Sequence, residues 1–144
     1  MISDLLQRIK EIENHYQKTF ITPANEENIQ LVKDWVSNNI RHGLWIGEYE
    51  DFLKKVDGLE FNGLVIYNTQ ADDNNNGIIA ANEIRRENRW DNEYLFFGDS
   101  DISWYCLDID KNIFVELDKP SGYIVGEFSS FNEMIEEAIT SVLI

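Results

Sequence analysis

The most specific chemical pattern in the sequence is a calcium-loop pattern that begins at Asp72 and ends at Glu83. Side-chain oxygens stand at alternate positions, Gly77 would allow the sharp turn, and Glu83 would bind the ion through both carboxylate oxygens. A loop of this kind should follow a helix, yet the residues before Asp72 have the pattern of a strand and a loop. We therefore favour a solvated loop rich in Asn and Asp, and we keep a calcium-dependent module as the alternative.

Two pairs of aspartates are a second candidate for chemistry: Asp99 with Asp101, and Asp108 with Asp110. Alternate residues of a strand share a face, so each pair could bring two carboxyls together for acid–base catalysis. Catalysis requires one carboxyl buried enough to raise its pKa, and nothing in the sequence indicates such burial. Asp99 and Asp101 also fit a tight turn, where aspartate is favoured for local hydrogen bonding. We expect no enzymatic activity.

Other residue types give little support for metal, thiol or cofactor chemistry. His15 and His42 have no cysteine pair near them, so a zinc site is not expected. Cys106 lies in an apolar strand pattern, and we interpret it as a small core residue. A single cysteine allows no internal disulfide, which fits a reducing cytoplasm. We find no phosphate loop and no dinucleotide-binding fingerprint, and we expect no cofactor.

The charge of the chain indicates a protein partner instead. The formal net charge is −15, which disfavours direct binding of nucleic acid or of an anionic membrane. Residues 90–144 contain 12 acidic and 2 basic residues, a net charge of −10, and such a face can steer a basic protein toward it. We expect an aromatic anchor at Trp104 or Tyr105. The predicted partner-binding residues are Asp99, Asp101, Trp104, Asp108, Asp110, Glu116 and Asp118.

The elements that must position these residues are predicted to be strands of one sheet. Two aromatic-rich runs, 94–97 and 102–109, are joined by a turn that begins at Gly98, and they are expected to form the centre of the sheet. The further strands are predicted at 64–67, 113–117 and 123–128, with a brief strand over 77–80.

Apolar residues at helical spacing predict five helices around this sheet. The first predicted helix begins at Ser3, with an apolar stripe that reaches Tyr16, and the second begins at Thr22 or Asn25. The third begins at Gly47 or Glu48 and ends at Asp57. The fourth runs from Ala81 to Arg89 with Ile84 facing inward, and the fifth begins at Ser130. Ser130 and Glu133 form a capping box. Arg85, Arg86 and Arg89 are expected to form a small basic patch beside Trp90.

The order of these elements predicts a single domain over residues 1–144. Its fold class is α+β, with a mainly antiparallel sheet of about five or six strands flanked by helices. No apolar run approaches the roughly 20 residues of a membrane helix. The beginning of the chain also lacks the pattern of a secretion signal, so we expect a cytoplasmic protein.

Several short motifs, in this order and spacing, resemble the SUKH superfamily. Tyr49-x-x-Phe52-Leu53, Gly58 and the run 61–64 resemble its helix and Asn-Gly turn. One departure is the run 45–48, which stands where the superfamily often has a leucine-proline pair. The motifs that are similar to the YrhA-like branch of Gram-positive bacteria are Ala81-Asn82-Glu83-Ile84, Arg86-Glu87-Asn88, the run 94–101, Trp104-Tyr105 and Phe131-x-x-Met134.

This resemblance implies a SUKH-like α+β fold and a role as a non-enzymatic immunity protein. Such a protein, an antitoxin, binds and neutralises the cognate toxin of a polymorphic or contact-dependent toxin system. These toxins are often nucleases with basic clefts, which an acidic surface would complement. Distant eukaryotic relatives resemble regulatory scaffolds, so a regulatory adaptor with an endogenous protein partner is the alternative.

Overall fold

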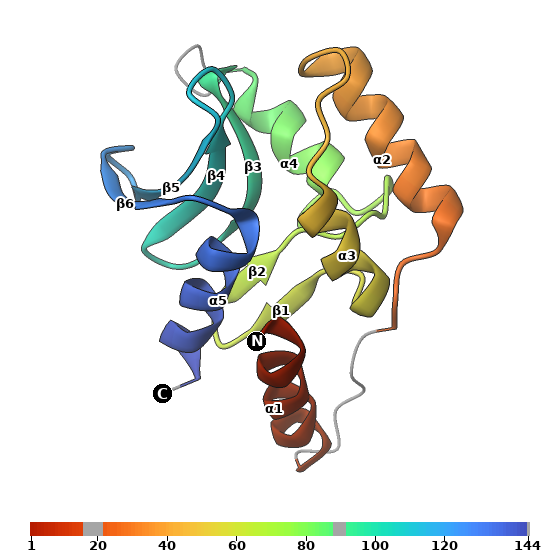
Figure 1. Cartoon of the computed structure of the whole chain (residues 1–144), viewed down its shortest axis with the longest axis vertical. Coiled ribbons are helices and arrows are strands. Elements are labelled where there is room, and N and C mark those ends of the chain that lie inside the picture. The colour runs from red at the N-terminus through yellow and green to blue at the C-terminus, as the bar shows by residue number, and fades with distance from the viewer. Residues whose placement is uncertain (16–21, 88–91, 144) are drawn as a thin grey trace.

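The computed structural model describes residues 1–15, 22–87 and 92–143, which form five helices and six strands (Figure 1). The helices are α1 (Ile2–His15), α2 (Glu26–Asn39), α3 (Gly47–Lys55), α4 (Ile78–Arg85) and α5 (Phe131–Val142). The strands are β1 (Leu59–Phe61), β2 (Leu64–Ile66), β3 (Tyr94–Asp99), β4 (Ser103–Asp108), β5 (Ile113–Asp118) and β6 (Ile124–Phe128). The predicted α+β class is confirmed. Tyr16, Arg89 and Trp90 lie outside the described residues.

The six strands form one antiparallel sheet in the order in which they occur along the chain, from β1 to β6. Asp99 of β3 lies opposite Trp104 of β4, and Ser103 of β4 lies opposite Asp118 of β5. The β3–β4 turn and the end of β5 therefore meet at one end of the sheet. β6 is an edge strand, at the far side of the sheet from α2 (Figure 1).

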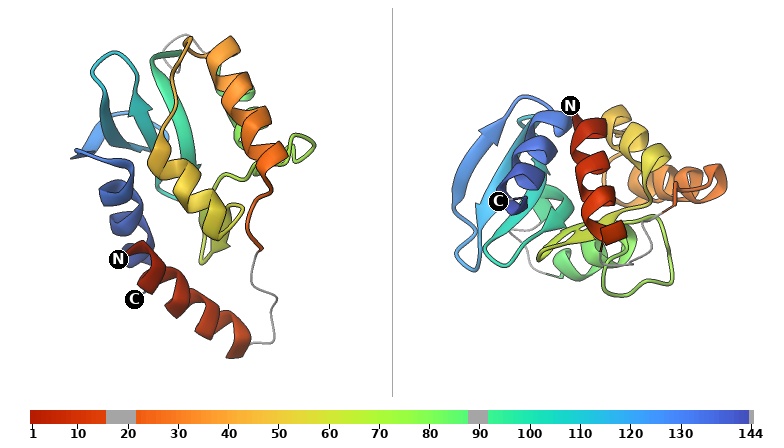
Figure 2. Two further views of the ribbon diagram at one scale, coloured as in Figure 1. Left: turned by 45° about the vertical axis from the view of Figure 1, so that its right-hand side comes forward. Right: turned by 90° about the horizontal axis from the view of Figure 1, so that it is seen from below.

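Helices cover both faces of the sheet. Phe131, at the start of α5, packs against Phe97 of β3 and Tyr49 of α3, with ring centroids 5.2 and 5.6 Å away. α1 lies beside α5, as Figure 2 shows from below. The Phe96 side chain points to the opposite face of the sheet from Phe97 and lies under the Arg85 guanidinium of α4. The α5 face and the α4 face are thus the two sides of the same strands.

The hairpin of β1 and β2 was only partly predicted. Asn62 and Gly63 join the two strands with φ of 49° and 85°, the two positive values that a type I′ turn requires. Asn62 also donates from Nδ2 to the Val142 carbonyl at 2.9 Å, which ties the turn to the end of α5. β1 was not predicted, because its three residues are too few to show an alternation of apolar and polar side chains.

The predicted brief strand over 77–80 is wrong, because α4 begins at Ile78. Ile78 and Asn82, four residues apart, share the buried face of this helix. Ile84, predicted to face inward, lies two residues further on and is 52% exposed. The polar Asn82 takes the inward position that the apolar pattern assigned to Ile84.

Two predicted helix starts also change. α2 begins after Asn25, whose Oδ1 accepts a hydrogen bond from the Asn28 N–H at 2.8 Å, so the start predicted at Thr22 is wrong and the alternative at Asn25 is confirmed. α1 begins at Ile2, which places Ser3 inside the first turn rather than at the cap.

The closing helix starts as predicted, with a modified capping box. Ser130 Oγ accepts from the Glu133 N–H at 3.1 Å. The Glu133 carboxylate accepts from the backbone N–H and the hydroxyl of Ser129, rather than from Ser130.

Candidate protein-binding site

The seven predicted partner-binding residues fall at two ends of the sheet. Asp108 and Asp110 lie where β4 turns into β5, and the others lie near the β3–β4 turn. The six residues of β4 are separated by five steps of about 3.3 Å, so its two ends lie roughly 17 Å apart. The group near the β3–β4 turn consists of Asp99, Asp101, Trp104, Glu116 and Asp118.

The carboxylates at the β4–β5 turn are used within the protein. Asp108 is buried and accepts from the Lys111 N–H at 3.2 Å, inside its own turn. Asp110 accepts from the Arg41 guanidinium at 2.5 Å, and Arg41 also donates to the Ile109 carbonyl at 3.4 Å. These contacts hold the turn against the segment that follows α2. We therefore place the candidate site at the other end of the sheet.

Trp104 and Asp99 are packed into the α4 face. The Trp104 side chain is 6% exposed, with the Arg85 guanidinium 4.7 Å and the Lys119 amine 5.6 Å from its ring centroid. Lys119 also lies 3.4 Å from the Asp99 carboxylate, which accepts from the Tyr67 hydroxyl at 2.5 Å. Trp104 can contact a partner only if its cover of cationic side chains moves. Tyr105, the other proposed anchor, is also buried.

The α5 face of the same corner carries a group of acids around a hollow of about 420 Å³. Asp101, Glu116 and Glu137 line this hollow, and no described lysine or arginine does. Glu116 accepts from the Ser103 hydroxyl at 2.5 Å. Burial is the main cause that raises the pKa of Tyr105, and the negative charge of the nearby Glu116 adds to the shift. This side of the corner is therefore strongly negative.

Four large apolar side chains are exposed at this end of the sheet. We name them the corner patch: Ile102, 71% exposed; Tyr123, 77%; Ile124, 44%; and Val125, 60%. Two backbone bonds bring the segments that carry them together, from Lys119 N–H to the Ile102 carbonyl at 3.0 Å and from Asp118 N–H to the Tyr123 carbonyl at 2.8 Å. Exposed apolar groups that cluster and are rimmed by polar residues mark interaction sites.

The corner patch was not predicted, although the sequence contains two signals for it. Ile102 follows Asp101 directly in a polar turn, where an apolar residue has nothing local to pack against. Residues 123–125 are three consecutive apolar residues, whereas a strand with one exposed face normally alternates apolar and polar residues. The register of β6 shifts between Glu116 and Leu117 of β5, and the shift leaves Val125 without an opposite residue.

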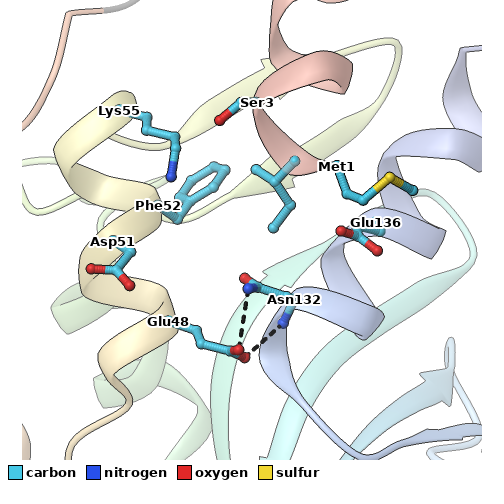
Figure 3. A pocket seen from close by; sticks show the side chains of 9 residues that line it. Met1, Ser3, Glu48, Asp51, Phe52, Lys55, Asn132 and Glu136 are labelled. Carbon is cyan, nitrogen blue, oxygen red and sulfur yellow. Dashed lines mark hydrogen bonds between the residues drawn. The ribbon is translucent and has the colours of Figure 1, made fainter.

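A second hollow, of about 370 Å³, lies between α3 and the N-terminal parts of α1 and α5 (Figure 3). The Glu48 carboxylate accepts from both the backbone N–H and the Nδ2 of Asn132, each at 3.1 Å. A carboxylate at this position satisfies a free N–H group in the first turn of α5 and complements its dipole. We interpret this hollow as the junction of three helices.

The segment with the calcium-loop pattern closes through Asp73. Its carboxylate accepts from the N–H groups of residues 75–76 at 3.0 and 2.9 Å, and from Asn68 Nδ2 at 3.0 Å. These bonds lower the pKa of Asp73, with the Asn68 contact the largest cause. Asp72 and Glu83, the first and last ligands of the pattern, are both exposed. Within the described ranges, no group of three or more His, Cys, Asp or Glu side chains is arranged to hold a metal ion.

Comparison with known proteins adds no family to this picture. No protein-family model matches the sequence, and no curated protein is similar to it at a significant level. In the described part of the chain, none of the helices has the length and apolar character needed to cross a membrane.

Proposed function

We propose that this protein is a non-enzymatic, SUKH-type immunity protein that acts in the cytoplasm. It binds a basic cognate toxin, such as a nuclease, and neutralises it. The observation that carries this proposal is the corner patch. Its exposed Ile102 lines the same hollow as Asp101 and Glu116, and the carbonyl of its exposed Tyr123 accepts from the Asp118 N–H. Apolar contacts supply binding energy once water is excluded, and the acids steer a basic partner toward this end of the sheet.

The SUKH-like motifs support the proposal through the positions of their residues. Tyr49 and Phe52 of the first motif pack on Phe131 of the last one, with ring centroids 5.6 and 6.2 Å away. The Asn62-Gly63 pair, which resembles the Asn-Gly turn of the superfamily, forms the hairpin turn between β1 and β2. These motifs thus describe one packed core, with the corner patch at the rim of its sheet.

The proposal is tested with the product of the adjacent gene, which we expect to be the toxin, used in an inactivated form. We expect binding with an association rate that falls as salt concentration rises, because screening weakens the steering. The triple variant Asp101→Asn, Glu116→Gln, Asp118→Asn should slow association by about tenfold or more and flatten that salt dependence. Surface plasmon resonance at several salt concentrations measures both quantities.

A matched control removes the same number of charges from α2, at the other side of the molecule, in the variant Glu26→Gln, Glu27→Gln, Asp34→Asn. It should leave association within about twofold of the unmodified protein, because distant exposed charges are largely screened. Equal slowing by both triple variants would reject the corner as the binding site. An adjacent gene product that neither binds nor kills cells would reject the immunity function.

A further inference from the structure

The outer edge of β6 runs through the corner patch and carries little of the protection usual for an edge strand. β6 pairs with β5 on one side, and it lies last in the sheet order. Soluble proteins normally shield such an edge with charges, prolines, bulges or a covering element. Here Glu127 is the only charged residue of the strand, and a bulge at Val125 is its other protective feature.

The backbone hydrogen bonds identify groups that a further strand can reach. The Asp118 N–H donates to the Tyr123 carbonyl, so Tyr123 directs its oxygen toward β5. Successive residues of a strand direct their backbone groups to opposite sides. The N–H and C=O of Ile124 therefore point away from β5. They lie between the exposed side chains of Tyr123 and Val125.

We propose that β6 accepts an extended, lysine- or arginine-containing segment of the toxin as a seventh strand. This inference rests on the proposed function, and it specifies how the partner is held. Backbone bonds at Ile124 would set the register, and the apolar side chains would pack on the patch. Glu116, Asp118 and Glu127 lie on β5 and β6 close to this edge, where they pair with basic side chains of the added strand.

Charge selects this occupant over a second copy of the chain. Each copy carries a formal net charge of −15, so edge-to-edge pairing of two copies would bring like charges together. A basic strand reverses this effect.

The test compares Ile124→Pro with Ile124→Ala in binding to the same inactivated toxin. Proline removes an N–H that points away from β5, so the bonds between β5 and β6 are kept. Alanine removes the apolar side chain but keeps the N–H. We expect Ile124→Ala to raise Kd by about threefold, and Ile124→Pro to raise it by about tenfold more, because it leaves a toxin carbonyl without its donor.

A second measurement follows the backbone directly and needs no substitution. In the unmodified protein, NMR should show fast hydrogen exchange at the Ile124 amide when the protein is free. In the complex, exchange at that amide should be slowed by at least about tenfold, since a hydrogen-bonded amide exchanges only on opening.

The outcomes separate this inference from the proposed function. If the toxin binds but the two variants have equal Kd and the Ile124 exchange rate is unchanged, strand addition is overturned and the proposed function stands. If light scattering shows a dimer that Ile124→Pro converts to monomer, a second copy occupies the edge and the inference fails. If the unmodified protein does not bind the toxin, the proposed function fails and the toxin is ruled out as the occupant.

Discussion

Asn82 completes the hydrogen bonding of β3 from inside a helix. β2 pairs with β3 only as far as Gly98, so the backbone of Phe96 lacks a strand partner on that side. The Asn82 side chain supplies one, donating from Nδ2 to the Phe96 carbonyl at 2.9 Å and accepting from the Phe96 N–H at 2.8 Å. Its side chain is buried, so no water can take over these bonds. One amide thus links α4 to the sheet.

We expect Asn82→Leu to lower the free energy of unfolding by about 3 kcal/mol, because it leaves two buried backbone groups without partners. Asn38→Leu, at an exposed position of α2, makes the same chemical change where nothing is buried, and should stay within about 0.5 kcal/mol. Urea denaturation measures both. Similar losses in the two variants would contradict this role for Asn82.

At the scale of elements, β2 and β3 approach each other at Gly98. The register of β3 against β4 shifts between Phe96 and Gly98, so Phe97 has no opposite residue on β4. A Cβ at Gly98 would lie 2.4 Å from the Val65 carbonyl oxygen, closer than any real contact. The glycine is therefore needed for the contact between the two strands, and not for an unusual backbone angle.

Gly98→Ala should lower stability by about 2 kcal/mol or more, because β2 must move away from β3 to make room. Gly126→Ala is the matched control on β6, where a Cβ would have its nearest neighbour at 3.4 Å, in a phenylalanine ring. We expect Gly126→Ala to change the melting temperature by no more than about 2 °C. Equal shifts in melting temperature for the two variants would show that the close approach of β2 at Gly98 is not the cause of the stability loss.

At the scale of the whole molecule, buried tyrosines connect the core to the acidic corner. The Tyr49 hydroxyl donates to the Tyr67 carbonyl at 2.7 Å, and the Tyr67 hydroxyl donates to Asp99. Burial raises the pKa of both phenols well above the ordinary value, and nearby carboxylates add to the shift. Both side chains are therefore protonated in the folded protein well into the alkaline range.

These shifts predict a loss of stability at alkaline pH. Above about pH 10 the unfolded chain releases phenol protons that the folded protein retains, so the free energy of unfolding falls as pH rises. Below that pH both states are protonated, and this contribution is fully present. Urea denaturation between pH 8 and 11 should show the fall, and Tyr49→Phe should reduce its slope. Tyr123→Phe, at an exposed residue, should not change the slope.

The sequence by itself determined the features that depend on neighbours within a few residues. The apolar face of α5, the strand patterns from β3 to β6 and the acidic balance of the second part of the chain could all be read from spacing and residue type. Helix and strand periods arise from local backbone geometry, so they can be recognised in the sequence without knowledge of the fold. The same reasoning failed at α4, where Asn82 rather than Ile84 faces inward.

Only the tertiary structure decided which acids and apolar residues share a surface. Asp110 meets Arg41 from 69 positions earlier in the chain, and Trp104 lies beneath Arg85 and Lys119, so neither is freely available to a partner. Ile102 and Tyr123 come together because β5 pairs with β4 on one side and with β6 on the other. Strand register and long-range packing depend on the whole core, and a local pattern contains no information about them.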